Sequence, residues 1–365
     1  MAMTLDGSNG VTFNDSSLQG AAASPYVLKN RIINGDMRID QRNAGASITP
    51  TVNTYSVDRW YCLVSAASKY SAQQVSDAPT GFVNSLKITS LSSYTVAATD
   101  TFYVRQTIEG FNIADLGWGS ATAKTITLSF WVKSSLTGTF GGSLTNISWN
   151  RSYPFSYTIS SANTWEQKTV TITGDITGTW NTTNDVGVRV GFGLGVGSTY
   201  SGTAGAWAAS EYESSTGATS LLATNGATWQ ITGVQFEIGT SATPFERRMI
   251  QTEYQLCERY FIKKTNFNVY GSGSMLTTTA AKLYFGPAQM RASPTSAYGS
   301  TGNQFRIYGG SAAYAVSSID ENNATADSLT TTYITSGALT VGWGVVGISP
   351  ASAPSSWYVS FSAEL

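Results

Sequence analysis

Apolar and polar residues alternate along most of this chain with the period of two that is typical of β-strands. Residues 125–133 show the pattern well, because four apolar residues share one face: Ile126, Leu128, Phe130 and Val132. Comparable runs lie at 31–40 (two short strands around the turn Asn34-Gly35), 56–64, 85–90, 102–108, 155–159, 165–172, 186–192 and 229–238. Repeated short strands with no helix between them predict an all-β antiparallel sandwich.

Residues 244–264 break this pattern, because eight charged residues fall within 21 positions and glycine is absent. Apolar residues recur there at close to a helical repeat, at Phe245, Met249, Leu256 and Tyr260. Thr243 is suited to cap a helix and Pro244 to occupy its first turn. The pattern predicts one helix of about four turns that ends near Arg259.

These patterns divide the chain into four parts. Residues 1–29, rich in Gly, Ser, Ala and Asn, form either a disordered tail or an arm that orders on a partner. The sandwich covers 30–241, the connecting helix 242–264, and a smaller C-terminal β domain 265–365. Residues 193–228 are poor in strand signal and predict a long loop on the sandwich rim.

Composition excludes several classes of function. Of the 365 residues, 21 are Lys or Arg and 22 are Asp or Glu, with no basic run, so binding to nucleic acid or to an anionic membrane is not expected. No apolar run is long enough to span a membrane, and the N-terminus predicts no signal peptide. The absence of His removes serine triads and His-metal sites. Cys62 and Cys257 are expected to be buried thiols.

Tryptophans in loop contexts are the candidate binding residues, because an aromatic face stacks on the apolar side of a sugar ring while nearby polar groups bond its hydroxyls. The first cluster is Trp149, Asn150, Arg151 and Tyr153, and the second is Trp180, Asn181, Asn184 and Asp185, with Trp207 as a further candidate. The alternative is that these rings only cover hydrophobic edges or contacts between subunits.

Catalysis and metal binding find little support in the sequence. A glycosidase needs two carboxyl groups facing each other across a cleft. The candidates Asp175, Asp185, Glu211 and Glu213 lie in predicted loops, where carboxylates are usually solvated. We therefore predict no enzyme, no catalytic residue, no metal ligand and no cofactor.

Two resemblances extend these expectations. The segments 33–37, 105–108, 127–133, 165–172 and 232–237 come in the order found in jelly rolls that resemble carbohydrate-binding modules. Such modules often hold a structural calcium ion near the sheet edge, and many have a late Asp where this chain has Thr232-Gly-Val-Gln235. The resemblance therefore leaves a structural calcium ion open, while this departure speaks against it. Nearly the whole chain also resembles bacteriophage tail fibres and related virion proteins, through segments that include 4–13, 30–37, 57–60, 235–246, 253–261, 290–294 and 362–365.

The phage resemblance implies a homotrimer that attaches to the virion through its N-terminal arm and recognises the host surface. In a trimer, Phe245, Met249, Leu256 and Tyr260 would face the threefold axis; otherwise they pack on their own sandwich. The sequence therefore predicts a trimeric virion adhesin, assembled in the host cytoplasm, that binds host surface glycan. The alternative is a structural virion component, such as a capsid fibre, decoration or baseplate protein, without receptor binding.

Overall fold

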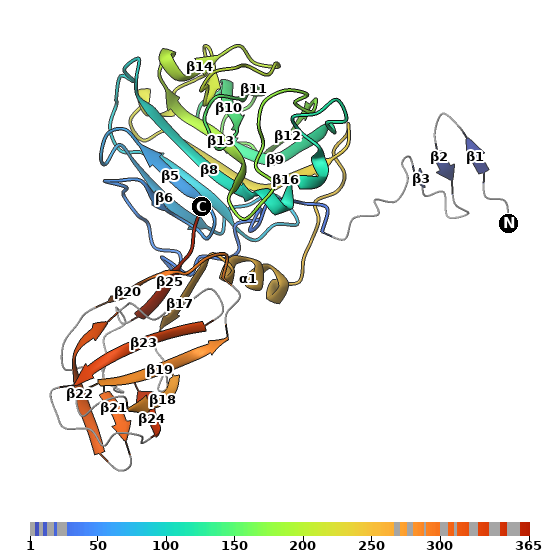
Figure 1. Cartoon of the computed structure of the whole chain (residues 1–365). Coiled ribbons are helices and arrows are strands. Elements are labelled where there is room, and N and C mark those ends of the chain that lie inside the picture. The colour runs from blue at the N-terminus through green and yellow to red at the C-terminus, as the bar shows by residue number, and fades with distance from the viewer. Residues whose placement is uncertain are drawn as a thin grey trace.

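The computed structural model describes residues 28–263, 290–295 and 360–365 in full and, elsewhere, the backbone of the strands. Two antiparallel sheets form a sandwich, and α1 (Ile250–Glu258), β17 (Phe261–Thr265) and β25 (Tyr358–Ser362) lie at one end of it (Figure 1). The predicted all-β sandwich is thus confirmed, and the described residues contain one α-helix.

The two sheets contain eleven strands, and every pairing within them is antiparallel. The six-stranded sheet has the order β11 (Ser152–Ile159), β10 (Gly138–Thr145), β13 (Val186–Val196), β8 (Thr101–Glu109), β5 (Tyr61–Val64) and β4 (Thr54–Tyr55). The five-stranded sheet has the order β12 (Glu166–Ile172), β9 (Ile126–Ser134), β16 (Thr228–Ile238), β7 (Ser85–Ser90) and β6 (Tyr70–Val75).

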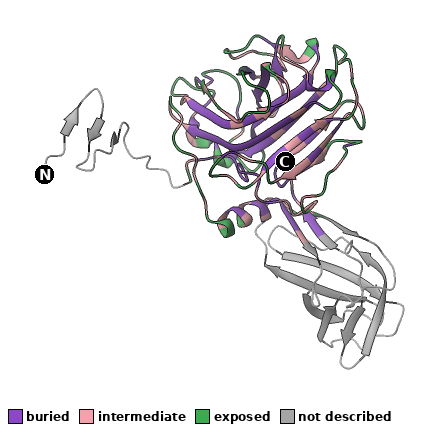
Figure 2. Cartoon of the chain, turned by 180° about the vertical axis from the view of Figure 1, so that it is seen from behind, coloured by how far each residue is buried: buried purple, intermediate pink, exposed green. Residues whose placement is uncertain are grey.

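The core lies between the two sheets, where the inward positions of the alternating strands meet (Figure 2). Phe192 of β13 is its centre: its ring lies 5.0 Å from that of Phe130 and 6.0 Å from that of Trp229, both on the opposite sheet. Trp60 packs there too, as its strand pattern suggests, and both Cys62 and Cys257 are buried free thiols.

Residues 31–40 do not form the predicted pair of strands. Asn34 has a φ of 55°, and its side-chain amide bonds the carbonyls of Ile39 and Asp58 at 2.8 and 2.9 Å. Ile39 N donates in return to Asn34 Oδ1. The side chain of Asn34 therefore closes a compact loop and replaces the hydrogen bonds of a hairpin.

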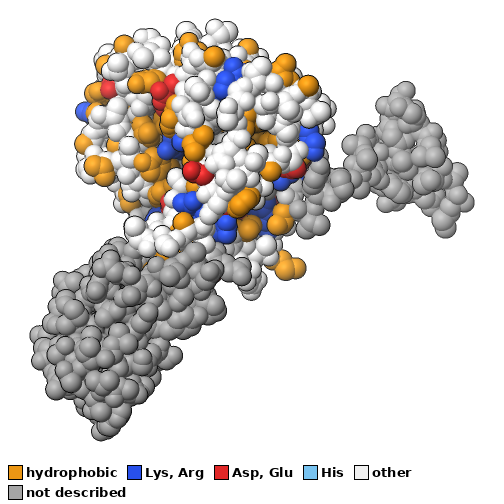
Figure 3. All heavy atoms as spheres, viewed as in Figure 1, with side chains coloured by type: hydrophobic (Ala, Val, Ile, Leu, Met, Phe, Trp, Pro, Cys, Tyr) orange, Lys and Arg blue, Asp and Glu red, His pale blue; other side chains and the backbone are white. Residues whose placement is uncertain are grey.

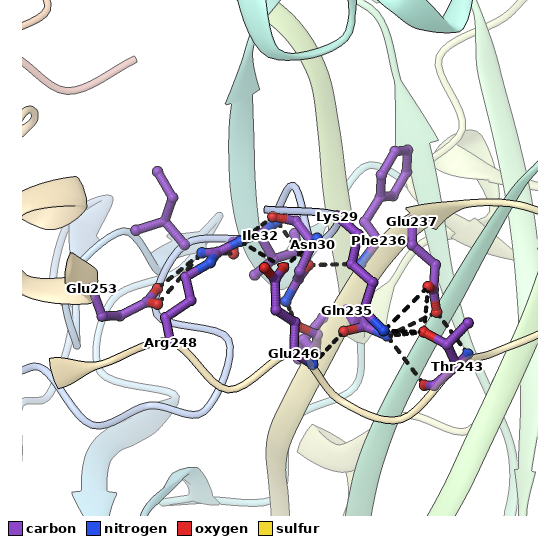
Figure 4. A network of polar contacts seen from close by, with 12 residues as sticks. Lys29, Asn30, Ile32, Gln235, Phe236, Glu237, Thr243, Glu246, Arg248 and Glu253 are labelled. Atoms are coloured by element: carbon purple, nitrogen blue, oxygen red, sulfur yellow. Dashed lines mark hydrogen bonds and ion pairs between the residues drawn. The ribbon is translucent and has the colours of Figure 1, made fainter. Parts of the chain in front are cut away.

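The helix is shorter than predicted: α1 covers Ile250–Glu258 only. Residues 243–249 run extended along the sandwich, held by a polar network that Figure 4 shows in detail. Glu246 N donates to Gln235 Oε1 at 2.7 Å, and Arg248 Nη1 donates to Ile32 O at 3.1 Å. Thr243 bonds the carboxylate of Glu237 and so caps no helix. No helix of the described residues is long and apolar enough to cross a membrane.

The four residues predicted for a threefold axis lie in different surroundings. Phe245 packs on Phe82 with ring centroids 5.2 Å apart, and Leu256 packs beside the buried Cys257. Met249 is 79% exposed. Tyr260 is fully buried within its own chain, so it does not face another copy.

The C-terminal strands form two further sheets. The first has the order β17 (Phe261–Thr265), β25 (Tyr358–Ser362) and β20 (Thr295–Gly299). The second is a closed barrel of β18 (Gly271–Met275), β19 (Ala280–Pro287), β23 (Ser328–Thr335), β22 (Ala312–Asp320), β21 (Arg306–Gly309) and β24 (Gly344–Ile348). The predicted N-terminal arm lies outside the fully described residues, except for Lys29 and its neighbour Leu28; the backbone shows β1 (Thr4–Asp6), β2 (Gly10–Thr12) and β3 (Leu18–Gln19).

Paired charges join the sandwich to the C-terminal tail, a region that we call the joint (residues 259–263 and 360–365 with their sandwich partners). Arg59, only 2% exposed, forms an ion pair with Glu364, and its guanidinium lies 3.4 Å from the centre of the Tyr260 ring. Glu109 at the end of β8 accepts two bonds from Arg259 and one from Tyr260. Burial opposes ionisation of Glu109, but these bonds outweigh it and hold its pKa below the usual value.

Breaking one pair of the joint tests its contribution to stability. Glu364→Ala is expected to lower the free energy of unfolding by about 3–5 kcal/mol, because Arg59 then stays buried without its counter-charge. Urea denaturation followed by tryptophan fluorescence measures the change. Asp115→Ala serves as the control, since the pair Arg31–Asp115 is partly exposed and worth about 1 kcal/mol or less. A loss no larger than that of the control would contradict the prediction.

Candidate functional site

The outer face of the six-stranded sheet carries an unusual mixture of charge and glycine. Along β8, Phe102 and Val104 point into the core, which leaves Tyr103 and Arg105 on the outer face. In the neighbouring strand β13, Gly191 lies opposite Arg105 and Gly193 opposite Tyr103. In β10, Gly141 and Ser143 continue the same rows. The centre of this face therefore has very little side-chain volume.

Part of the long loop that follows β13 fills this space. Its short strands β14 (Ser201–Gly202) and β15 (Ser214–Ser215) pair with each other in parallel. A Cβ atom added to Gly141 would lie 2.3 Å from Ser214 Oγ, and one added to Gly193 would lie 2.9 Å from it. Glycine is required at position 141 for β15 to lie directly on the sheet, because its Cβ would also lie 2.8 Å from the backbone N of Ser215, while Gly193 avoids a tight contact with the Ser214 side chain. The loop predicted for the rim instead crosses the outer face.

A small pocket remains beside β15 and is the candidate site. Its lining consists of Tyr103, Arg105, Ser143, Thr145, Trp149, Arg189, Gly191 and Glu213. Its free volume of about 10 Å³ is enough for one water molecule. A sugar ring does not fit inside, so only a small group projecting from a ligand can enter, while the rest of the ligand lies over the rim.

Trp149 forms one wall of the pocket in a strained backbone conformation, with a φ of 57°. The guanidinium of Arg189 lies 4.0 Å from the centre of its ring and that of Arg105 lies 5.3 Å from it. Arg189 also donates to the carbonyls of Asn146 and Ile147, which fixes the turn that carries Trp149. The ring is half-buried, so part of it stays accessible to a ligand.

Burial changes the ionisation of the charged groups in the pocket. Burial raises the pKa of Glu213 to about 7, and the charge of Glu211 adds to this shift. Burial, together with the charge of Arg105, lowers the pKa of Arg189 to about 10. Burial also raises the pKa of Tyr103. One carboxylate oxygen of Glu213 is buried without a hydrogen-bond partner among the described residues, which adds to the cost of ionising this carboxyl group.

The structure brings the two predicted tryptophan clusters to one end of the sandwich but buries several of their rings. Trp180 packs against Trp118 at 4.8 Å and against Trp207 at 5.3 Å, and Tyr153 lies 5.2 Å from Trp207. Trp180 is 8% exposed and Tyr153 is 6% exposed. These two rings cover the edge of the core and offer no open face to a sugar, whereas Trp207 is half-buried.

The polar members of the same clusters mostly support the loops. Arg151 forms a two-pronged ion pair with the buried Asp175, which also accepts a bond from Trp180 Nε1 at 3.0 Å. Burial disfavours ionisation of Asp175, but the bonds from Arg151 and its neighbours hold its pKa below the usual value. The exposed side chain of Asn150 bonds Asn146. None of these residues lines the pocket.

Two further candidates lie elsewhere on the loops. Asn181 accepts bonds from the backbone N–H and hydroxyl of Thr183, and the exposed Asp185 accepts one from Val186 N. Trp149 is thus the one predicted glycan-binding residue that lines the pocket.

The residues at the expected calcium position do not fit a cation. Gln235 directs its amide nitrogen at Glu237 Oε1 at 2.8 Å, and Thr243 bonds both oxygens of the same carboxylate (Figure 4). The single carboxylate therefore already has donors on both oxygens, while calcium needs several oxygen ligands. Among the described residues, no group of three or more Cys, Asp or Glu residues is arranged to hold a metal ion.

Sequence reasoning missed Tyr103, Arg105 and Arg189, and it considered Glu213 only as a loop carboxylate of a possible acid pair. The sequence does indicate that the first three point outward, because the alternation along 102–108 and 186–192 places them on the polar face of their strands. Glu213 was expected to be solvated, but it is 7% exposed. No local pattern indicates which loop lies across a sheet, so its burial had no signal in the sequence.

Comparisons with known proteins add little to this geometry. No protein-family model matches the sequence, and the curated proteins contain no match. Among solved structures, the enzymatically active domain of tailspike protein 4 of bacteriophage CBA120 is similar with a TM-score of 0.30 and 13% identity. That match covers 58% of this chain and 22% of the tailspike chain.

Sugar-binding proteins appear among the similar structures as well. A putative sugar-binding protein from Bacteroides thetaiotaomicron has a TM-score of 0.34 and 11% identity, and the match covers 57% of this chain and 100% of that one. A family 11 carbohydrate-binding module of a Clostridium thermocellum cellulase has a TM-score of 0.28 and 12% identity, with 55% and 100% covered. Similarity at this level carries no argument, and the sandwich rests on its own strand pairing.

The raised pKa of Glu213 predicts a pH-dependent cost in stability. The buried carboxyl favours its neutral form in the folded protein, so stability falls as the pH rises from about 4.5 to about 7. Glu213→Gln is expected to raise the free energy of unfolding at pH 8 by about 2–3 kcal/mol and to leave it unchanged at pH 4. Urea denaturation at the two pH values measures the difference.

Glu166→Gln is the control for this prediction. Burial alone would raise the pKa of Glu166, but the bonds from Lys168 and two backbone N–H groups outweigh this effect, so the pKa lies below its usual value. Replacing Glu166 by a neutral side chain is therefore not expected to raise the free energy of unfolding at pH 8. Equal changes in the two variants at pH 8 would contradict the assignment of Glu213.

Proposed function

We propose that this chain is a non-enzymatic receptor-binding protein of a phage virion, a tail fibre or a related fibre, that binds host surface glycan on the outer face of its six-stranded sheet. The observation that supports this proposal is the pocket in which Trp149, Arg105, Arg189 and Glu213 converge. An accessible aromatic ring beside fixed polar groups is a common arrangement for binding small polar ligands.

The makeup of the pocket favours binding over catalysis. Glu213 is the one carboxylate among its eight lining residues, while hydrolysis of a glycosidic bond generally requires two. The free volume of about 10 Å³ also leaves no space for a sugar ring next to that carboxylate. An extended ligand lying over Trp149 with one group inserted is the binding mode that this geometry supports.

The surface outside the pocket suits an assembled fibre. The described part of the surface is mostly uncharged, with small separate groups of Lys, Arg, Asp and Glu in this view (Figure 3). At the start of α1, Met249 is 79% exposed and Ile250 is 45% exposed. We propose that these two side chains contact other copies in a homotrimer, whose three linked sites raise the avidity for a repeating glycan.

Removal of the aromatic wall tests the proposed binding site. Trp149→Ala is expected to weaken binding of the full chain to polysaccharide from host envelopes by tenfold or more, because the stacking surface is lost. Biolayer interferometry on immobilised polysaccharide measures the affinity, and chromatography of the recovered polysaccharide measures its chain length, which is expected to stay unchanged.

Trp165→Ala is a matched control, since Trp165 also lies near a cation, with Lys133 Nζ 5.2 Å from its ring centre, but is attached to the five-stranded sheet. Equal loss in both variants would place the binding site elsewhere. Absence of binding by the intact protein would instead favour a structural virion component, and shortened polysaccharide would indicate an enzyme.

Sedimentation velocity tests the assembly. The full chain at micromolar concentration is expected to sediment as a trimer, and Met249→Glu is expected to shift it toward single chains, because the new charge would be desolvated at the contact. Ile176→Glu, at a residue that is 64% exposed on a loop of the sandwich, controls for the added charge. A single chain for the unchanged protein would refute the trimer.

A further inference from the structure

Arg105 and Arg189 differ from most arginines of the described residues. Seven others form an ion pair with a carboxylate: Arg31, Arg38, Arg42, Arg59, Arg151, Arg248 and Arg259. Arg105 and Arg189 instead face aromatic rings and form no ion pair with a described carboxylate within 4.0 Å. Their hydrogen bonds go to uncharged groups: Arg105 donates to the Tyr103 hydroxyl at 3.0 Å, and Arg189 donates to two backbone carbonyls.

The pocket therefore holds more positive charge than negative. Two guanidinium groups and one carboxyl line it, although the whole chain has a net charge of −1. Two like charges lie close together in a partly buried place, since both guanidinium groups lie over the same Trp149 ring, at 5.3 Å and 4.0 Å from its centre. Such an arrangement is unfavourable unless an anion joins it.

The geometry also limits the size of that anion. The free volume of about 10 Å³ admits a group of the size of a water molecule, such as one carboxylate oxygen. The donors come from two adjacent strands, because Gly191 of β13 pairs with Arg105 of β8, two positions along from Arg189. Ser143 and Thr145 of β10 line the same pocket with hydroxyl groups. A planar carboxylate attached to a sugar ring matches this set of donors.

We propose that the pocket recognises the carboxylate of an acidic sugar, with Arg105 and Arg189 as its partners and Trp149 against the sugar ring. This inference rests on the proposed function and specifies its ligand class: polysaccharides that contain uronic acid or another carboxylated sugar. Arg105 is the specificity-determining residue, because Gly191 on one side leaves space beside it, while the ring of Tyr61 on the other side, 4.9 Å from its guanidinium, holds it in place.

Glu213 makes this recognition dependent on pH. The groups that face it are Tyr103 and Arg105 of β8, Arg189 of β13, and Glu211 of its own loop. Below about pH 7, Glu213 is mostly protonated and the bound carboxylate meets two positive charges. Above that pH, an ionised Glu213 repels the ligand, so affinity decreases as the pH rises.

A comparison of matched polysaccharides tests the proposal. Acidic polysaccharides from host envelopes are immobilised in their native form and in a form whose carboxyl groups have been chemically reduced to alcohols, which keeps the linkages and removes the charge. The full chain at pH 6 is expected to bind the native form at least tenfold more tightly. Equal affinity for both forms overturns the acidic specificity and leaves the proposed function standing. Binding to neither form refutes both.

Variants connect this specificity to the pocket. Arg105→Gln is expected to reduce the preference for the native form by tenfold or more, and Arg105→Lys to restore part of it, because the charge returns without the planar guanidinium. Arg247→Gln makes the same charge change beside Phe82 and is expected to have no effect. An unchanged preference in Arg105→Gln overturns the proposal, and urea denaturation confirms that each variant is folded.

The pH dependence supplies a second readout. Between pH 6 and pH 8 the unchanged protein is expected to lose affinity for the native polysaccharide severalfold, while Glu213→Gln is expected to keep nearly the same affinity at both values. The sugar carboxylate stays ionised over this range, so the change reports on Glu213. Equal pH dependence in the two proteins overturns the role of Glu213.

Discussion

The candidate site depends on a steric constraint, which is the lack of side chains at the centre of the six-stranded sheet. Gly141 and Gly193 allow β15 to lie directly against the strands, since a Cβ atom at either position would collide with Ser214. β15 in turn carries the adjacent Glu213 to the side of Arg105 and Arg189. Without these glycines the loop would have to leave the sheet, and the pocket would lose one of its walls. The pocket is therefore a product of backbone packing as much as of its charged residues.

Charged side chains have different partners at the joint and in the pocket. At the joint, each buried ion has a close partner: Arg59 pairs with Glu364, and Glu109 accepts bonds from Arg259. In the pocket, Arg189 and Glu213 are buried and Arg105 is half-buried, and none of the three forms an ion pair with a described residue, which costs stability. Residues that lower stability in this way are more common at binding sites than in structural cores. The contrast supports a functional role for the pocket and a structural role for the joint.

The sandwich could be predicted from the sequence because a strand reveals its two faces locally. Alternation at 125–133 and 186–192 depends only on neighbouring residues, and both segments lie in the strands expected. The helix was predicted too long because its first half is held by residues more than 200 positions away, such as Asn30 and Ile32.

The candidate site was predicted only in part for a similar reason. A loop context does not reveal burial, so the tryptophans that pack at the sandwich edge looked the same as Trp149. The position of a long loop over a sheet depends on tertiary contacts that no local pattern records.

The way in which the chain enters and leaves the C-terminal strands has a mechanical consequence. β17 begins directly after the joint, and β25 ends directly before it, with Phe261 opposite Ser362 and Thr265 opposite Tyr358. Two antiparallel segments, rather than a single flexible linker, thus connect the strands between them to the sandwich. A pull applied between the two parts is shared by both segments, which five residue pairs join side by side. Such a double tether holds the two parts more stiffly than one linker would.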